Sequence, residues 1–212
     1  MAPHTPQRSE PPRRSRGGPR FRATRYPFVT LPDYLARGLD LVFVGINPGT
    51  YSVARGHYFA RSTNRFWPAF SRSRLSLPIR RALGVDVLGP EHDRTLLDFG
   101  IGFTDVVKRP SANAAGVTPT DFAEWAPRLA QRIRRYRPRV ACFHGLTAYR
   151  PFARIVLGVD SPSVLGAQRD RLAETRLFVV PNPSPANAHF TVADQAAWYE
   201  RLAEFMEAPS AA

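Results

Sequence analysis

The chain has 212 residues, 43% of them hydrophobic and 11% aromatic, which suffices for one folded domain with a sizeable core and excludes a wholly disordered chain. The single cysteine, Cys142, excludes a disulfide framework, a cysteine-ligated zinc site and an iron–sulfur cluster. Lys and Arg number 30 against 17 Asp and Glu, and the resulting net charge of +13 favours a polyanionic partner such as nucleic acid.

Residues 1–25 are rich in Pro, Arg, Ser and Gly and show no apolar periodicity, which predicts a disordered basic arm. This segment holds seven Arg and one Glu, so it carries +6 of the total charge of +13. Two interpretations stay open for it: phosphate binding that weakens with salt, or a solvated tail without a role. The chain has neither an apolar run of the roughly 20 residues that a membrane span needs nor a signal-peptide core. We therefore expect a soluble cytoplasmic protein.

From residue 26 onward, short apolar runs alternate with helical patterns. Thr30 as a cap, Pro32 in the first turn and Gly38 as a stop predict a short helix. Continuous apolar, β-branched runs are typical of strands that are buried on both faces of a sheet. We expect strands at 41–46, 101–107, 139–144 and 176–180, and further helices at 64–67, 94–99, 121–136, 147–156 and 191–206.

Strands that alternate with helices predict an α/β domain over residues 26–212, with a mainly parallel sheet of four strands. Ligands of such sheets bind outside the carboxyl ends of the strands. The candidate site therefore comprises residues 47–49, 104–105, 144–145 and 182–185, each of which follows or ends a strand. Two of these segments are Asn-Pro turns, which combine polar groups with a rigid backbone and suit a planar polar ligand.

The chain also contains a series of short motifs. The first is Gly45-Ile46-Asn47-Pro48-Gly49, and the last is Pro181-Asn182-Pro183-Ser184. Between them lie Gly56-His57-Tyr58-Phe59, Asn64-Arg65-Phe66-Trp67, Leu96-Leu97-Asp98, Gly102-Phe103-Thr104 and Lys108-Arg109-Pro110. Taken in this order, over roughly residues 38–206, the set closely resembles the mismatch-specific uracil-DNA glycosylase and thymine-DNA glycosylase family.

The resemblance implies a three-layer α/β domain, with helices flanking the sheet, that flips a damaged or mismatched pyrimidine out of duplex DNA and hydrolyses its N-glycosidic bond. By match of motif, Asn47 positions the water that attacks C1′, and Phe59 stacks on the flipped base. Backbone groups around Gly45, Ile46 and Phe59 hydrogen-bond the uracil edge. Tyr58, beside the stacking position, either limits access for a 5-methyl group or is an ordinary packing residue.

Asp105 departs from the family pattern, because relatives carry Asn or Lys at the end of the second strand. The amide of Asn47 orients a water molecule but cannot accept its proton, whereas a carboxylate can. Asp105 is therefore a candidate general base, or a group that stabilises the cationic sugar. The alternative interpretation is a turn aspartate that pairs with Lys108 or Arg109.

The segment after the last motif departs from the family as well. The resemblance places residues 184–188 in the duplex gap left by the flipped base, but no bulky or basic wedge follows Ser184 here. We therefore predict a weak preference for a mismatched partner and activity on single strands or on uracil opposite adenine. A preference for G·U over A·U above about a hundredfold, or about 2.7 kcal/mol, contradicts this prediction. The candidate DNA-binding residues are Asn182, Pro183, Ser184, Pro185, Ala186, Asn187, Ala188 and His189, with Arg55 and Arg61 as phosphate contacts.

Other conspicuous side chains are assigned to structure. His57 and His144 are interpreted as a loop residue and a buried strand residue that satisfy local hydrogen bonds. Phe66 and Trp67 are expected to pack their helix onto the sheet. Four arginines at helical spacing, at positions 128, 132, 135 and 139, are expected to form a solvated face.

We interpret the chain as a monofunctional DNA glycosylase that acts as a monomer, without metal or cofactor. Its expected partners are double-stranded DNA with uracil or mismatched or damaged bases, and single-stranded DNA. Two rival functions stay open: a non-catalytic binder of mismatched or abasic DNA, and a hydrolase of free nucleosides. The intact Asn47 and Phe59 argue against the first rival, and the excess of basic charge argues against the second.

Overall fold

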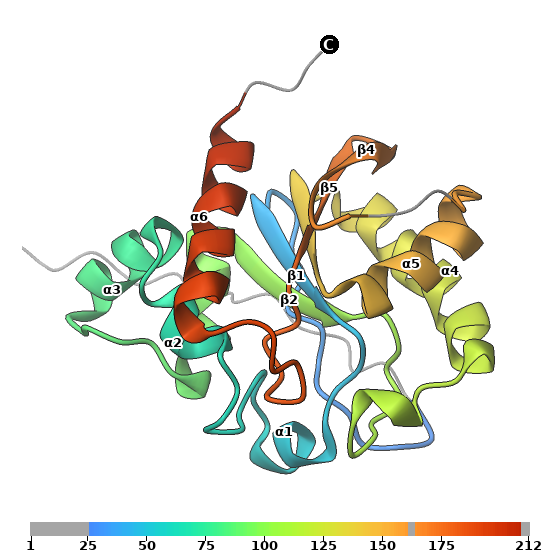
Figure 1. Ribbon diagram of the computed structural model, residues 1–212, viewed down its shortest axis with the longest axis horizontal. Coiled ribbons are helices and arrows are strands. Elements are labelled where there is room, and N and C mark those ends of the chain that lie inside the picture. The colour runs from blue at the N-terminus through green and yellow to red at the C-terminus, as the bar shows by residue number, and fades with distance from the viewer. Residues whose placement is uncertain (1–25, 161–163, 209–212) are drawn as a thin grey trace, which may run out of the picture.

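The computed structural model describes residues 26–160 and 164–208, so the basic arm predicted at 1–25 lies outside the described residues. Its sheet has five strands in the order β2-β1-β3-β5-β4 (Figure 1). The first four of these strands pair in parallel, and β4 pairs antiparallel with β5. The strands are β1 (Leu41–Gly45), β2 (Ile101–Asp105), β3 (Val140–His144), β4 (Gly166–Leu172) and β5 (Thr175–Val180). The α-helices are α1 (Thr50–Arg55), α2 (Phe66–Phe70), α3 (Leu77–Leu83), α4 (Pro119–Tyr136), α5 (Leu146–Leu157) and α6 (Val192–Glu207), joined by short 3₁₀ turns at Arg74–Ser76, Pro90–His92, Thr95–Phe99 and Ala114–Gly116.

The sheet has one strand more than the four that the sequence predicts. The additional strand, β4, has the sequence GAQRDRL, in which half-buried and exposed residues alternate. This strand lies at the edge of the sheet, where only one neighbour pairs with it, so it lacks the continuous apolar run of the central strands. Its turn into β5 runs through Ala173, which has a positive φ of 54° without being glycine or asparagine, so the sequence carries no turn signal there.

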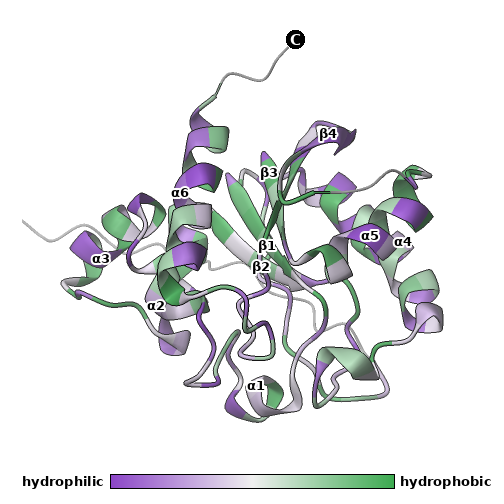
Figure 2. Cartoon of the chain, in the orientation of Figure 1, coloured by the Kyte–Doolittle hydropathy of each residue, from purple (hydrophilic) through white to green (hydrophobic). Residues whose placement is uncertain are grey.

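Helices cover both faces of the sheet, as expected for a three-layer α/β domain. Helices α4 and α5 lie over one face, and α2 and α6 lie over the other (Figure 1). Alternate residues of β1 supply the two interiors, because Val42 and Val44 pack toward α4 and α5 whereas Leu41 and Phe43 pack toward α2 and α6. Figure 2 shows the resulting pattern of apolar strands at the centre and hydrophilic residues along the outer helices.

The long helices begin at capping boxes. Helix α4 starts earlier than predicted, because Thr118 is its N-cap. The Thr118 N–H donates to Oδ2 of Asp121, and the Asp121 N–H donates to Oγ1 of Thr118.

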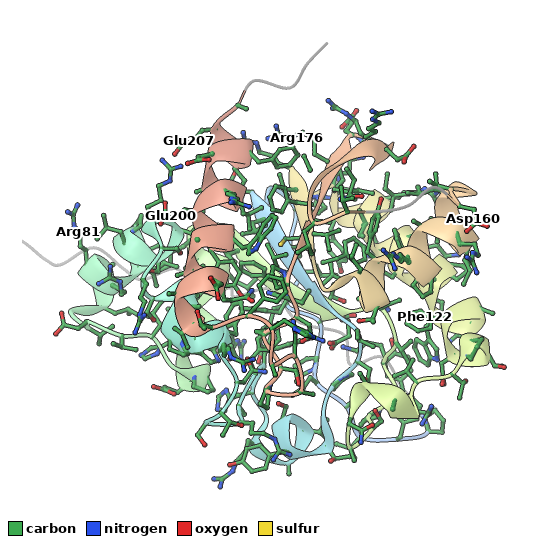
Figure 3. The ribbon with its side chains drawn as sticks, in the orientation of Figure 1. Arg81, Phe122, Asp160, Arg176, Glu200 and Glu207 are labelled. Atoms are coloured by element: carbon green, nitrogen blue, oxygen red, sulfur yellow. The ribbon has the colours of Figure 1, made fainter. Side chains whose placement is uncertain are left out.

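Helix α6 is held against the rest of the domain by charged contacts. Arg74 pairs with Glu200 and Glu207 of this helix, both labelled in Figure 3. Arg176 of β5 donates to the carbonyl oxygen of Met206, at a nitrogen–oxygen distance of 3.2 Å.

The short helix predicted after Thr30 is wrong. Residues 30–38 contain no helix, and Tyr34 forms an isolated bridge with Phe103 of β2 through two backbone hydrogen bonds of 2.8 and 3.0 Å. Gly102 permits this approach, since a Cβ at that position would collide with the carbonyl oxygen of Tyr34. Backbone pairing with the sheet therefore overrides a local pattern of cap, proline and glycine.

The carboxyl ends of the four parallel strands point to one edge of the sheet. Helix α1 and the loops that follow β1, β2 and β5 gather at this edge (Figure 1, lower part). The fold thus brings together the four segments that the sequence predicts to form the candidate site.

Candidate active site

A cavity of about 730 Å³ opens at the carboxyl edge of the sheet. Residues from all four nominated segments line it, together with Tyr58 and Phe59 from the loop after β1. The strand-end residues on its wall include Gly45, Asn47, Asp105, His144 and Asn182. Gly45 and Asn182, which are 137 positions apart in the chain, therefore border one space.

Asn47 is held in one orientation by two neutral acceptors. Its amide nitrogen donates to Oγ of Ser111 at 2.8 Å and to the carbonyl oxygen of Arg109 at 3.0 Å. Because the two amide hydrogens are engaged in this way, the carbonyl oxygen Oδ1 is left as an acceptor for a water molecule. Ser111 is anchored in turn, since its backbone N–H donates to the carbonyl oxygen of Pro48 at 3.2 Å. Sequence reasoning missed Ser111, which lies outside the quoted motifs.

Asp105 ends β2 and is only 3% exposed. Its Oδ1 lies against the backbone of Gly45, where an added Cβ would come within 2.5 Å of this oxygen. Its Oδ2 lies 3.5 Å from Nζ of Lys108 and has no hydrogen-bond partner among the described residues. Burial raises the pKa of Asp105 to about 6, against the opposing effect of Lys108. The carboxyl group therefore titrates just below neutral pH at the wall of the cavity.

Both sequence interpretations of Asp105 agree with this placement. The side chain pairs with Lys108, as expected for a turn aspartate, and it also borders the cavity next to Gly45. Arg109, the other partner considered, pairs with Asp121 at 2.6 Å instead. The role of Asp105 stays a prediction.

A second carboxylate, Asp33, lies behind Asp105 and was missed by sequence reasoning. Lys108 donates to Oδ1 of Asp33 at 3.0 Å, and Nε of Arg132 lies 3.4 Å from Oδ2. Arg132 also donates to the backbone carbonyl oxygen of Asp105 at 3.1 Å. The prediction that Arg132 belongs to a solvated face is therefore wrong: its side chain is 16% exposed, because it turns inward to this cluster.

Phe59 lines the cavity and is half-buried. One face of its ring stacks on Phe66, with ring centroids 4.3 Å apart and planes 17° from parallel. The ring of His144 lies edge-on to both, 5.2 Å from Phe59 and 5.5 Å from Phe66. An aromatic ring at the cavity wall suits stacking with a planar base.

The backbone at Phe59 has a φ of 53°, an uncommon value for a bulky residue. Its neighbour Tyr58 is fixed on both sides, because the Tyr58 N–H donates to Asp93 at 2.9 Å and Nε1 of Trp67 donates to the Tyr58 carbonyl oxygen at 3.0 Å. The Tyr58 hydroxyl is directed away, donating to the carbonyl oxygen of Pro32 at 3.0 Å. These contacts hold the stacking ring in place. They also favour the packing interpretation of Tyr58.

The two histidines assigned to structure do have structural contacts. Nδ1 of His57 lies 3.3 Å from Asp93. His144 is 2% exposed, and its Nε2 lies 3.1 Å from the hydroxyl of Tyr199. Burial lowers the pKa of His144 to about 3, so its ring is neutral at physiological pH. His144 nevertheless borders the cavity, and its Nδ1 has no partner among the described residues.

The loop after β5 is tied to the start of α2 by one arginine. The guanidinium of Arg65 donates to the carbonyl oxygens of Ser184 at 2.8 Å and Asn187 at 3.2 Å. Within the loop, the Asn182 carboxamide oxygen accepts from the Ser184 N–H at 3.0 Å. Among the predicted DNA-binding residues of this loop, Asn182, Ser184, Pro185, Ala186 and Asn187 line the cavity, whereas Pro183 is buried beside it and Ala188 and His189 are exposed outside it.

Arg61 and Tyr51 line the cavity, and Arg55 lies beside Tyr51 outside this lining. The guanidinium carbons of Arg55 and Arg61 are 5.3 and 5.1 Å from the centre of the Tyr51 ring, in cation–π range. Both side chains are exposed, and neither forms a salt bridge with the carboxylates of the described residues. This placement suits contacts to phosphate groups at the mouth of the cavity.

Neither a metal centre nor a membrane span is found in the part of the chain that the structure describes. No group of three or more His, Cys, Asp or Glu side chains there is arranged to hold a metal ion. No helix in residues 26–160 and 164–208 is long and apolar enough to cross a membrane.

The sequence profile of the Uracil DNA glycosylase superfamily matches residues 32–205, most of the chain. The chain belongs to this superfamily. A G/U mismatch-specific uracil DNA glycosylase of Schizosaccharomyces pombe is 30% identical over 152 residues, which are 70% of this chain and 45% of that protein. The chain thus spans about half the length of this curated relative.

The fold of the superfamily is seen in a solved structure as well. A Methanosarcina acetivorans protein, solved by solution NMR and assigned provisionally as a uracil DNA glycosylase, aligns with a TM-score of 0.51 and 21% identity. The alignment covers 84% of this chain and 98% of that protein. The predicted family and the three-layer α/β fold are therefore confirmed, with a fifth strand. The roles of the individual site residues stay predictions.

Proposed function

We propose that this member of the superfamily is a monofunctional DNA glycosylase that removes uracil from DNA by hydrolysis of the N-glycosidic bond. One observation carries the proposal: the side chains of Asn47, Asp105 and Phe59 border one cavity. A flipped base stacked on Phe59 would bring its C1′ toward the two polar side chains. Family membership and the similarity to the fission yeast enzyme support the same activity.

The proposed step is a direct displacement of the base by water. Oδ1 of Asn47 accepts a hydrogen bond from the water and aims its oxygen at C1′. As the oxygen–C1′ bond forms, the C1′–N1 bond breaks, and its electron pair leaves with the uracil anion. Asp105 takes the proton that the water loses, and the uracil anion is later protonated from solvent. A carboxylate beside the sugar also stabilises the positive charge that develops there.

The base edge is proposed to meet backbone groups of Gly45, Ile46 and Phe59. The carbonyl oxygens of Gly45 and Ile46 each already accept a bond of 2.9 Å, from Val106 and Val107 respectively. Each carbonyl therefore has one lone pair left for the base. One of these carbonyl oxygens is enough to accept a hydrogen bond from N3–H, the single donor on this edge of uracil, and a backbone N–H such as that of Phe59 would donate to a uracil carbonyl oxygen.

Recognition of duplex DNA is assigned to the loop of residues 182–189 and to Arg55 and Arg61. The loop carries small side chains at Ala186 and Ala188 where a wedge would enter the duplex. We therefore propose a weak preference for a mismatched partner base, and activity on single strands. Arg55 and Arg61 contact phosphates through charge, independently of sequence.

The test is single-turnover excision of uracil from G·U, A·U and single-stranded oligonucleotides by wild type, Asn47→Ala and Asp105→Ala. We expect wild type to act on all three substrates and both variants to lose activity by about a hundredfold or more. Full activity of Asp105→Ala would return Asp105 to a structural role. A wild type that binds abasic DNA tightly without excising uracil would identify a non-catalytic binder. Cleavage of free deoxyuridine at a comparable rate would identify a nucleoside hydrolase.

A further inference from the structure

Four charged side chains from three parts of the chain meet at and behind the wall of the cavity. Asp33 belongs to the segment before β1, Asp105 and Lys108 lie at and after the end of β2, and Arg132 comes from α4. Lys108 is 1% exposed and is the only lysine of the chain. A buried ammonium group is costly unless several acceptors surround it, so this arrangement calls for a reason beyond packing.

The ammonium group of Lys108 lies between the two carboxylates. Its Nζ is 3.0 Å from Oδ1 of Asp33, 3.5 Å from Oδ2 of Asp105 and 3.5 Å from the hydroxyl of Tyr58. The short contact goes to Asp33, and the long contact goes to Asp105. The positive charge of Lys108 therefore acts on Asp105 electrostatically, from beyond the distance of a short hydrogen bond.

We propose that Lys108 and Asp33 are positioning residues that set the pH range in which Asp105 is ionised, and hence the pH range of the enzyme. The inference rests on the proposed role of Asp105 as a base or cation-stabilising carboxylate. Lys108 keeps Asp105 ionised despite its burial, and Asp33 limits this effect by drawing the lysine and by adding a negative charge nearby.

Their surroundings shift the pKa values of Asp33 and Asp105 in opposite directions. Burial alone would raise the pKa of Asp33, but Lys108, Arg132 and the Thr104 hydroxyl outweigh it and lower this pKa. For Asp105, burial dominates and raises the pKa to about 6, while Lys108 opposes the rise and Asp33 adds to it. A pair of this kind supplies one group that is always ionised and one that titrates near the working pH.

Charged and titratable groups face Asp105 from every packed element. Lys108 and Arg132 favour its ionised form, Asp33 disfavours it, and the buried hydroxyl of Tyr58 stays protonated because burial raises its pKa far above 10. His144, across the cavity, has a pKa of about 3 and does not titrate in the same range. Since Asp105 acts as a carboxylate, activity rises as pH increases through its pKa, near 6.

The test is the pH dependence of single-turnover uracil excision, from pH 4.5 to 9.5, for wild type, Lys108→Met and Asp33→Asn. We expect Lys108→Met to move the midpoint of the acid limb upward by about 1 to 2 pH units. A shift of two units lowers the rate at pH 7 about tenfold, and the loss disappears by about pH 9. Asp33→Asn is expected to move the midpoint downward. Lys108→Arg keeps the positive charge, so its midpoint is expected to equal that of wild type.

Shifts in opposite directions are the signature of this mechanism, because loss of packing would lower the rate equally at every pH. Unchanged midpoints in active Lys108→Met and Asp33→Asn variants would overturn the inference. Should Lys108→Met not fold, the carboxyl carbon resonance of Asp105, titrated by NMR in wild type and Asp33→Asn, decides the question: a lower midpoint in the variant supports the coupling, and an equal midpoint overturns it. If Asp105→Ala retains full activity, the proposed function of Asp105 fails, while the NMR titration still tests the coupling by itself.

Discussion

Asn47 and Asp105 border the same cavity from neighbouring strands, yet they are held by different forces. Asn47 is half-buried, and neutral oxygens of Ser111 and Arg109 accept its amide hydrogens. Asp105 is buried, and the nearest group to its Oδ2 is the charged Nζ of Lys108, at 3.5 Å. One residue is fixed by hydrogen bonds and the other by a balance of charges.

The difference separates orientation from protonation. Hydrogen bonds between neutral groups do not change with pH over the range in which proteins are stable, so they fix the direction of the Asn47 carbonyl under all conditions. Charges in a buried site act on proton affinity instead. Changes around Asn47 should therefore alter the rate at every pH, whereas changes to the charges around Asp105 should alter the pH range.

The largest expected effect on the single-turnover rate comes from replacing Asn47 and Asp105. Single variants Asn47→Ala and Asp105→Asn are each expected to lose about 10²–10³ in the single-turnover rate. Because both act on one water molecule, we expect Asn47→Ala/Asp105→Asn to lose little more than the worse single variant. A loss close to the product of the two single losses, about 10⁵, would show instead that the residues act on different steps.

The next effect tests the contact between the two regions at Gly45. Gly45→Ala would place a Cβ 2.5 Å from Oδ1 of Asp105 and displace the carboxylate. We expect the single-turnover rate to fall by about 10–100-fold, with the fold intact by circular dichroism. Gly49→Ala adds a methyl group at a second glycine of the cavity wall without touching Asp105, because a Cβ there meets nothing within 4 Å and the φ of Gly49 is −69°. Equal rates for the two variants would mean that the position of the Asp105 carboxylate over Gly45 is unimportant.

A smaller effect is expected at Ser111, which orients Asn47. Ser111→Ala removes one of the two main acceptors of the Asn47 amide and leaves the carbonyl of Arg109. We expect a loss of about 5–10-fold in rate, corresponding to about 1 kcal/mol. The loss should be the same from pH 5 to pH 9, and Ser111→Thr, which keeps the hydroxyl, should recover most of it. A shifted pH midpoint in Ser111→Ala would contradict the separation of orientation from protonation.

The sequence predicts where Asn47 and Asp105 lie, but it does not predict the residues that contact them. Asn47 and Asp105 follow buried apolar runs, and parallel strands bring their carboxyl ends together, so both residues could be placed at one site. Ser111, Asp33 and Arg132 carry no comparable signal. Asp33 lies 75 positions before Lys108, and only the tertiary fold joins the two. Such partners follow from packing between elements, which periodicity does not report.

The same limit explains the errors in the fold. Central strands are predictable because burial on both faces demands continuous apolar residues. The edge strand β4 meets no such demand, and its alternating polar sequence resembles a loop. The segment around Tyr34 has a helical start signal, but its backbone finds partners in Phe103, which lies 69 positions away. Local signals fail where long-range backbone pairing satisfies the same groups.

The smallest effect extends the comparison from the cavity to the surface beside it, where charge acts without burial. Arg55 and Arg61 are exposed and stack on Tyr51, so they can neutralise phosphates but cannot change proton affinities inside the cavity. For Arg55→Gln/Arg61→Gln we expect the slope of log K against log salt for duplex binding to become shallower by about 1.8, at about 0.9 per phosphate contact. The excision rate at saturating enzyme and its pH midpoint should stay within about twofold of wild type.

Arg134→Gln is the control for charge loss away from the cavity, and it removes one positive charge. Arg134 is an exposed arginine in the last turn of α4, which leads into the start of β3 and thus lies at the edge of the sheet opposite the cavity. We expect its salt slope to equal that of wild type, because a residue there has no phosphate within reach when a base occupies the cavity. Salt slopes measured by fluorescence anisotropy on one uracil-containing duplex compare the variants directly. Equal slopes for Arg55→Gln/Arg61→Gln and Arg134→Gln would show that the bound strand does not pass over Tyr51.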